Sequence, residues 1–245
     1  MKSFRIYSRL AAEDARTFFA KVIRRTIRKV IEIVIRDIDL AAMFGDPNGA
    51  AAFEEAHLTE VPKFKSRADL YAHVLSQAKV PDGLNLEFGV YKGVSINRLA
   101  GLRPDLKFHG FDSFRGLPEA WNAGALKGAF SVDGKLPAVR DNVELVVGFY
   151  ETSLPPFAAA NAGRRIAFLH VDCDLYSSTK TVLFTLRDMI GEGTVIVFDE
   201  YFNYPNWQNS GECKAFMEFV VAAGIRYEFI GYIRHSVQMA VRITA

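Results

Sequence analysis

Cysteine is scarce in this chain, which has only Cys173 and Cys213 among 245 residues. Two cysteines cannot build a disulfide framework, so the composition favours the reducing cytoplasm. Long apolar runs are missing as well, because the best candidate, residues 30–38, is short and contains three charged residues. A membrane span needs about 18 uncharged apolar residues. We therefore expect no transmembrane segment, and the first residues also lack the apolar run of a signal peptide.

Net charge is small too, at +2, which argues against a nucleic-acid-binding protein. The charge is unevenly spread: residues 1–40 hold ten Lys/Arg and five Asp/Glu, a net of +5, so the other 205 residues carry −3. The chain has no internal repeats and no low-complexity tracts, and half of its residues are hydrophobic. This composition predicts a globular protein with a basic N-terminal segment.

The basic excess lies on an expected helix over residues 10–40, where apolar residues recur at three- and four-residue steps. One interpretation is a helix that buries this stripe against the body or a second subunit, giving a homo-oligomer. The other is a helix that docks on a membrane surface or an acidic partner. The sequence Asp46–Gly49 predicts a turn. We place a boundary near Pro62, between a helical extension over residues 1–62, acting as a lid or in oligomerisation, and a domain over residues 63–245.

After this boundary the chain alternates between helix and strand. Ser66 followed by Asp69 has the outline of a capping box and predicts a helix over residues 66–79. The expected strands are 84–89, 107–112, 143–147, 166–171, 194–198, 226–232 and 236–243, and the helices among them are 94–102, 155–161, 178–190 and 211–223. Repeated strand–helix units predict an α/β fold with a parallel sheet covered on both faces, and the closing hairpin adds an antiparallel edge.

Open α/β sheets bind ligands beyond the carboxyl ends of their strands, so the residues after each expected strand form the candidate site. The first strand leads into Glu87–Gly93, where two glycines in a G-x-x-x-G spacing either approach a ligand or simply make a turn. Asp112 follows the second strand, where a carboxylate accepts hydrogen bonds from ribose hydroxyls or caps a turn. The third strand leads into Gly148–Tyr150, where an aromatic ring meets an adenine or packs in the fold. Together, the first two motifs favour an adenosine-containing ligand.

Four carboxylates follow the fourth and fifth expected strands: Asp172, Asp174, Asp199 and Glu200. Neighbouring strands would bring them together, and unpaired carboxylates raise one another's pKa unless a cation such as Mg²⁺ intervenes. Two alternatives remain, because Asp174 is also placed to cap the next helix and Glu200 to face solvent. Cys173 lacks a basic neighbour in the motif and is interpreted as a small buried residue rather than a nucleophile.

The segments LEFGVYKGVSI, GFDSFRGLPE, FLHVDCDLYSSTK and VIVFDEY resemble class I methyltransferases of the macrocin O-methyltransferase (TylF-like) type, which use S-adenosylmethionine (SAM). The resemblance covers residues 84–243. Its specific signature is D-x-D-L-Y-x-S-T followed by a carboxylate pair after the next strand. It implies a Rossmann-like sheet of seven strands with the last one antiparallel. With the strand-end residues above, it implies a SAM site formed by Glu87, Phe88, Gly89, Tyr91, Gly93, Ser95, Asp112, Ser113, Gly148, Phe149 and Asp172.

The resemblance also implies a metal site. In the family, the first Asp of D-x-D and an Asp-Asp pair hold Mg²⁺, which binds two neighbouring hydroxyls of a sugar. The matching positions are Asp172, Asp199 and Glu200, so Glu replaces the last Asp and is longer by one methylene. Asp172 is also the candidate catalytic residue, which orients the metal or accepts the hydroxyl proton. The N-terminal segment does not match the family, so the resemblance gives no substrate lid for that segment.

The implied reaction is the in-line transfer of the SAM methyl group to a hydroxyl oxygen of a small molecule. A sugar or glycoside hydroxyl, as in natural-product synthesis, is the first expectation, and a phenol or catechol is the alternative. An NAD-dependent oxidoreductase would share Asp112, but the glycine spacing and the acidic cluster do not favour it. A non-catalytic member is opposed by the complete set of cofactor residues. Tyr201, Tyr204 and Trp207 either wall the acceptor pocket or pack within their loop.

Overall fold

The computed structural model describes residues 46, 48–122 and 124–245. The residues from 48 onward form one compact unit. The expected helix over residues 10–40 lies outside the described residues, so its role and the predicted boundary at residue 62 stay predictions. Among the described residues, no helix combines the length and the apolar character that crossing a bilayer requires.

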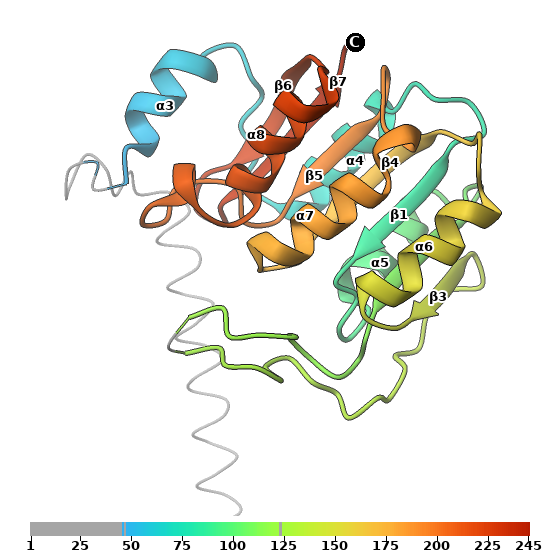
Figure 1. Ribbon diagram of the computed structural model, residues 1–245. Coiled ribbons are helices and arrows are strands. Elements are labelled where there is room, and N and C mark those ends of the chain that lie inside the picture. The colour runs from blue at the N-terminus through green and yellow to red at the C-terminus, as the bar shows by residue number, and fades with distance from the viewer. Residues whose placement is uncertain (1–45, 47, 123) are drawn as a thin grey trace, which may run out of the picture. The chain divides into compact units, whose positions relative to one another are not determined.

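In this part of the chain, a single sheet runs in the order β3-β2-β1-β4-β5-β7-β6 (Figure 1). Its strands are β1 (Leu84–Phe88), β2 (Phe108–Asp112), β3 (Val143–Val147), β4 (Ile166–Val171), β5 (Val195–Phe198), β6 (Tyr227–Ile233) and β7 (Gln238–Ile243). Strands β1 to β5 pair in parallel, and β7 is antiparallel to both β5 and β6. The predicted seven-stranded sheet with an antiparallel last strand is confirmed. However, β7 lies inside the sheet and β6 forms the edge.

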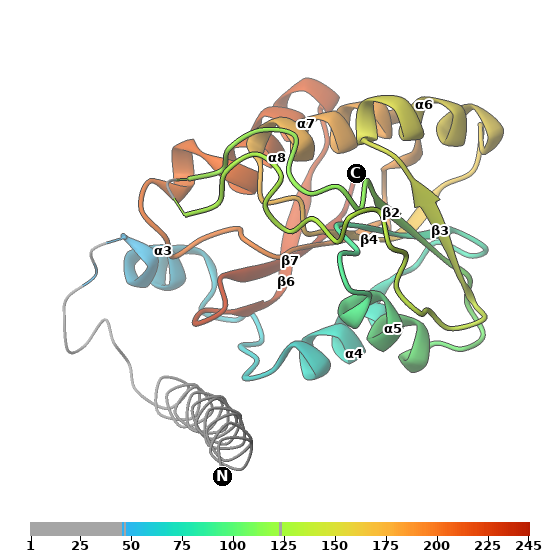
Figure 2. The ribbon, with the colours of Figure 1, turned by 90° about the horizontal axis from the view of Figure 1, so that it is seen from below.

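Helices cover both faces of the sheet, as predicted. The helices α4 (Arg67–Gln77) and α5 (Val94–Leu102) lie on one face, whereas α6 (Tyr150–Ala160), α7 (Tyr176–Thr185) and α8 (Gly211–Ala223) lie on the other (Figure 2). The bounds of α5 and α8 agree with the prediction. Helix α6 begins five residues before the expected start at residue 155, and α7 ends early, followed by a 3₁₀ turn over Arg187–Met189.

The central strands are the reason for this layering. Every residue of β1, β4 and β5 is buried, which is the pattern of parallel strands covered on both faces. Adjacent residues of β4 enter different cores: Phe168 packs in the cluster that contains α4 and α5, and Leu169 in the cluster that contains α7 and α8. Side chains alternate across a strand, so an unbroken apolar run supplies both cores.

The start of α4 is fixed by the predicted cap. The Ser66 hydroxyl oxygen accepts a hydrogen bond from the Asp69 N–H at 3.2 Å, and the hydroxyl donates to the Asp69 carboxylate at 2.6 Å. Such caps stabilise a helix by about 1 kcal/mol. The first helical residue is Arg67, whose guanidinium reaches Asp199 just past the end of β5. The cap therefore places a cation at the carboxyl end of the sheet.

Candidate active site

A cavity of about 280 Å³ opens at the carboxyl ends of β1 to β5. Its lining includes residues predicted from all five strand ends: Gly89, Tyr91, Asp112, Ser113, Gly148, Phe149, Asp172, Asp174 and Glu200. The volume is close to the lower end of the range for small-molecule sites, roughly 300–1,000 Å³. The predicted adenosine end and the acidic cluster thus share one cavity.

The loop after β1 requires glycine at its first position. Gly89 has φ +97°, and a Cβ atom built there would lie 1.9 Å from the carbonyl oxygen of Asp172. The N–H of Asp172 in turn donates to the carbonyl of Phe88 at 2.9 Å. No larger residue allows the ends of β1 and β4 to approach so closely. The second glycine, Gly93, has φ +76° and begins α5.

Asp112 is held by two backbone amides before any ligand arrives. Its Oδ2 accepts from the N–H of Tyr91 and its Oδ1 from the N–H of Phe114, each at 2.7 Å. Both donor residues have a positive φ, of 49° and 55°, which is a strained conformation for side chains of this size. Each carboxylate oxygen keeps a lone pair, so the geometry leaves Asp112 able to accept hydrogen bonds from ribose hydroxyls.

Four residues predicted to bind the cofactor do not line this cavity: Glu87, Phe88, Gly93 and Ser95. The carboxylate of Glu87 accepts from the Ser95 hydroxyl at 3.0 Å and lies 3.0 Å from Nδ1 of His170. The ring of Phe88 stacks on Phe111 in the core, with 4.6 Å between centroids. The physical reason is that β1 is buried on both faces, so its side chains point into the cores. In this structure Glu87 and Phe88 contact neighbouring side chains, and their role in cofactor binding stays a prediction.

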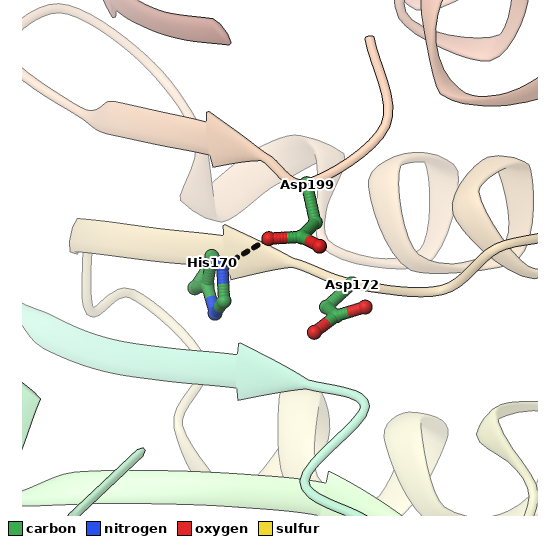
Figure 3. Close-up of side chains that lie close together, drawn as sticks. All are labelled: His170, Asp172 and Asp199. Carbon is green, nitrogen blue, oxygen red and sulfur yellow. Dashed lines mark ion pairs between the residues drawn. The ribbon is translucent and has the colours of Figure 1, made fainter. Parts of the chain in front are cut away.

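His170 is completely buried beneath the acidic end of the cavity. Its Nδ1 pairs with Glu87, and its Nε2 lies 3.2 Å from the Tyr71 hydroxyl and 3.8 Å from Oδ1 of Asp199 (Figure 3). Burial lowers the pKa of His170, but Tyr71, Asp199 and Glu87 outweigh this and raise that pKa well above its ordinary value. The ring therefore supplies positive charge to two buried carboxylates.

Asp199 is fully engaged by the protein itself. Its Oδ2 accepts from Nη2 of Arg67 at 2.9 Å, and its Oδ1 accepts from the side-chain amide of Gln238. Burial would raise the pKa of Asp199, but the neighbouring His170 and the charge of Arg67 bring that pKa below its ordinary value. Asp199 is thus an ionised carboxylate already paired with cations.

The predicted metal ligands do not form one group among the described residues. Asp172 belongs to two groups whose ligand atoms lie within 4.8 Å of one another: one with His170 and Asp199, the other with Asp174 and Glu200. The carboxylate of Asp199 accepts hydrogen bonds from Arg67 and Gln238. Asp174, rather than Asp199, is the third carboxylate grouped with Asp172 and Glu200. Asp174 does not cap α7, because that helix begins after Leu175 without a side-chain cap.

In the second group, the carboxyl groups of Asp172, Asp174 and Glu200 lie close together and all have raised pKa values. Burial, together with Asp199 and Glu200, raises the pKa of Asp172 well above its ordinary value. Burial, with Asp199 and Asp112, raises the pKa of Asp174 to about 6. Burial and Glu212 raise the pKa of Glu200, whose Oε2 is buried with no hydrogen-bond partner in the described part of the chain. This set of oxygen donors fits a hard divalent cation such as Mg²⁺.

Glu212, in the first turn of α8, was not predicted. Its side chain is fully buried, with Oε1 accepting from the N–H of Cys173 at 3.2 Å and Oε2 accepting from the N–H of Glu200 at 3.0 Å. Burial raises the pKa of Glu212 well above its ordinary value. The available signal was a glutamate at the start of the helix that follows the fifth strand-end loop.

The segment between β2 and β3, residues 113–122 and 124–142, is called the arm here and supplies the apolar wall of the cavity. The backbones of Leu117 and Ala129 pair at 2.9 Å, and Glu119 accepts a hydrogen bond from Ser177 at the start of α7. The arm contributes Trp121 and Phe130 to the lining, and these side chains are 39% and 46% exposed. The residues singled out from the sequence, Tyr201, Tyr204 and Trp207, do not line the cavity. Of the two interpretations given for them, loop packing holds.

Comparisons with known proteins agree with this fold. Residues 86–201 match the model of a family described as a methyltransferase domain. A structure of CalS11, a calicheamicin methyltransferase, is 28% identical with a TM-score of 0.57, covering 71% of this chain and 76% of that one. The O-methyltransferase NovP is 23% identical with a TM-score of 0.53, covering 73% and 80%. An apo structure of CalS11, described as a TDP-rhamnose 3′-O-methyltransferase, is 24% identical with a TM-score of 0.51, covering 71% and 78%. No curated protein matches.

The strand order, the carboxylate at the end of β2 and the matching domain define the class: this chain is a class I SAM-dependent methyltransferase. Within that class, the methyltransferase domain and the likeness to CalS11 support an O-methyltransferase. The TylF-like type stays a prediction from the double signature of D-x-D and the following carboxylate pair.

Proposed function

We propose that this enzyme methylates a hydroxyl group of a sugar or glycoside with the assistance of Mg²⁺. The observation that carries the proposal is one cavity that joins Asp112, the ribose carboxylate, to the oxygen cluster of Asp172, Asp174 and Glu200. The TDP-rhamnose acceptor named for CalS11 supports a sugar as the acceptor.

The cofactor end follows from the strand ends. Asp112 would accept from the ribose hydroxyls, and Gly148 with Phe149 would border the adenine, because these residues line the cavity beyond β2 and β3. The methionine end would then lie toward Gly89 and Asp172, where β1 and β4 meet. In this arrangement the sulfonium methyl group lies beside the acidic cluster, which is where an acceptor oxygen has to be held in line and about 3 Å away.

The acidic cluster would orient and activate the acceptor. Asp172, Asp174 and Glu200 are the residues that would hold the cation, with Asp199 nearby but paired to Arg67. When bound, the ion supplies positive charge that makes a neighbouring hydroxyl easier to deprotonate. Asp172 belongs to both acidic groups and is the carboxylate best placed to accept that proton.

The arm would hold the rest of the acceptor. Trp121 and Phe130 present partly exposed rings to the cavity, and such surfaces stack on the C–H faces of a sugar or on an aromatic ring. The same rings would also suit a phenol or catechol, which is the alternative acceptor class.

A methyl-transfer screen tests the proposal. TDP-sugars, glycosides and catechols would be offered with labelled SAM, in Mg²⁺ and in EDTA. We expect transfer to a sugar hydroxyl, loss of transfer in EDTA and recovery with Mg²⁺. Asp172→Asn should abolish transfer. Undiminished transfer in EDTA would remove the metal from the proposal, and transfer to catechols alone would replace the sugar.

A further inference from the structure

Glu212 connects the two strand-end segments that carry the acidic cluster. Past Val171 and Phe198 the parallel ladder ends, so the segments after β4 and β5 need another means of alignment. The carboxylate of Glu212 supplies it by accepting from the N–H of Cys173 at 3.2 Å and from the N–H of Glu200 at 3.0 Å. One side chain therefore fixes the peptide that follows Asp172 and the backbone of Glu200.

Burying the side chain of Glu212 reduces the stability of the fold, so its presence calls for a role other than stability, and alignment of the two segments is such a role. The side chain is completely buried, and the described residues place no cationic side chain in an ion pair with it. Burying an unpaired carboxylate destabilises a fold, and an apolar residue of similar volume is often more stabilising. The partial positive charge at the start of α8 offsets part of this cost.

The surrounding loop holds Glu212 in place. Gly211 has φ +53°, and a Cβ atom built there would lie 2.5 Å from the hydroxyl of Tyr204. That hydroxyl in turn donates to the carbonyl oxygen of Glu200 at 3.3 Å. The loop after β5 thus closes tightly against the helix start, and Glu212 has little freedom to reach other partners.

We propose that Glu212 is a positioning residue for methyl transfer, which sets the separation between Asp172 and Asp174 on one segment and Glu200 on the other. This inference rests on the proposed role of that cluster in holding a divalent cation. Glu212 itself would touch neither the cofactor nor the acceptor, because it does not line the cavity.

The test uses the whole chain loaded with S-adenosylhomocysteine (SAH) and Mn²⁺ as the probe, measured by the loss of the free-ion EPR signal. Glu212→Gln keeps the volume but turns an amide N–H₂ toward one of the two backbone donors, so one anchor is lost. We expect Mn²⁺ affinity to fall about tenfold or more, as for other supports of metal ligands, while SAH affinity changes by less than about twofold. Glu218→Gln, a half-buried change on the same helix that weakens the contacts with Lys180 and Tyr176, should alter neither affinity.

Each outcome decides the inference. Unchanged Mn²⁺ affinity in folded Glu212→Gln would overturn it, as would lower stability with unchanged affinity, which marks a merely structural role. If that variant does not fold, Glu212→Asp keeps the charge but is too short to reach both amides, and wild-type affinity there would equally overturn the inference. If the wild type binds no Mn²⁺, the proposed metal fails, and methyl transfer then decides: kcat in folded Glu212→Gln equal to that of the wild type would overturn the inference, and a lower kcat at unchanged SAH affinity would support it.

Discussion

The carboxylate of Glu87 lies 3.0 Å from Nδ1 of His170, and both side chains are completely buried between the two helical layers. The same imidazole faces Asp199 at 3.8 Å on its other side. The sheet therefore contains a line of alternating charge that begins at Glu87, passes through His170 and reaches the acidic end of the cavity at Asp199. This line supports the site from within rather than touching the cofactor.

Glu87→Gln should cost stability rather than cofactor affinity. The change leaves the charge of His170 facing a neutral amide, and breaking one partner of a buried pair typically costs about 3–5 kcal/mol. Urea unfolding should show that loss, while calorimetry on the folded protein shows SAH affinity within about twofold of wild type. Weaker SAH binding at unchanged stability would return Glu87 to the cofactor site.

Asp112→Asn should weaken SAH binding by about 1.5–3 kcal/mol, or roughly 10- to 100-fold, because a charged hydrogen-bond partner of the ribose is lost. Asparagine keeps the shape, although one of its two polar atoms can no longer accept from Tyr91 or Phe114. Isothermal calorimetry measures the change. Asp105→Asn is the matched control, since Asp105 is exposed and paired with Arg103. Equal affinities in all three proteins would remove Asp112 from the site.

Asp174→Asn should stabilise the metal-free protein at neutral pH. Burial, with Asp199 and Asp112, raises the pKa of Asp174 to about 6. An unfolded Asp titrates near 3.9, so between about pH 4 and pH 6 the folded state binds more protons and loses stability as the pH rises. The variant lacks this loss, so its free energy of unfolding in EDTA should exceed that of wild type by about 1–3 kcal/mol at pH 7.5. The gain should vanish near pH 4, and a gain independent of pH would contradict the assignment.

Trp121→Ala should weaken binding of the acceptor, whereas Trp207→Ala should lower the stability of the fold. Trp121 lines the cavity and is 39% exposed, so its loss should raise the KM for the acceptor about tenfold or more and leave melting temperature and SAH affinity nearly unchanged. Trp207 is 2% exposed and packs on Phe53 with 4.9 Å between ring centroids, so its truncation should cost about 3–5 kcal/mol of stability. Steady-state kinetics and thermal melts separate the two effects, and an unaltered acceptor KM in Trp121→Ala would exclude the arm from the acceptor site.

The strands could be predicted because each one is marked by closely spaced apolar residues in the local sequence. The bounds of β3 and β4 agree with the expected bounds residue for residue. For β4 the reason is that the apolar run Ile166–Val171 is buried throughout and is followed by a polar residue. Helix α6 was placed too late because Pro155 and Pro156 resemble a helix start, yet they lie inside the helix. There the packing of Leu154 outweighs the missing amide hydrogens.

The contents of the cavity could be predicted, but the pairing of its charges could not. Asp112, Asp172 and Glu200 are all found at strand ends because topology alone brings strand ends together. The ion pair of Asp199 with Arg67 joins residues 132 positions apart, and nothing near either residue marks the other as its partner. Glu212 could not be predicted from the sequence for the same reason, because its role depends on two backbone amides in other segments.

The position of β7 has a consequence for the order in which the protein is completed. This strand covers β5, and its residue Gln238 donates to the Asp199 carboxylate, so the site depends on a segment that follows all the cavity-lining residues in the sequence. A nascent chain that has not yet produced residue 238 has every cofactor residue but leaves β5 as an uncovered, wholly apolar edge. During translation, the strand ends that line the cavity can therefore be present while β5 is still an open, apolar edge.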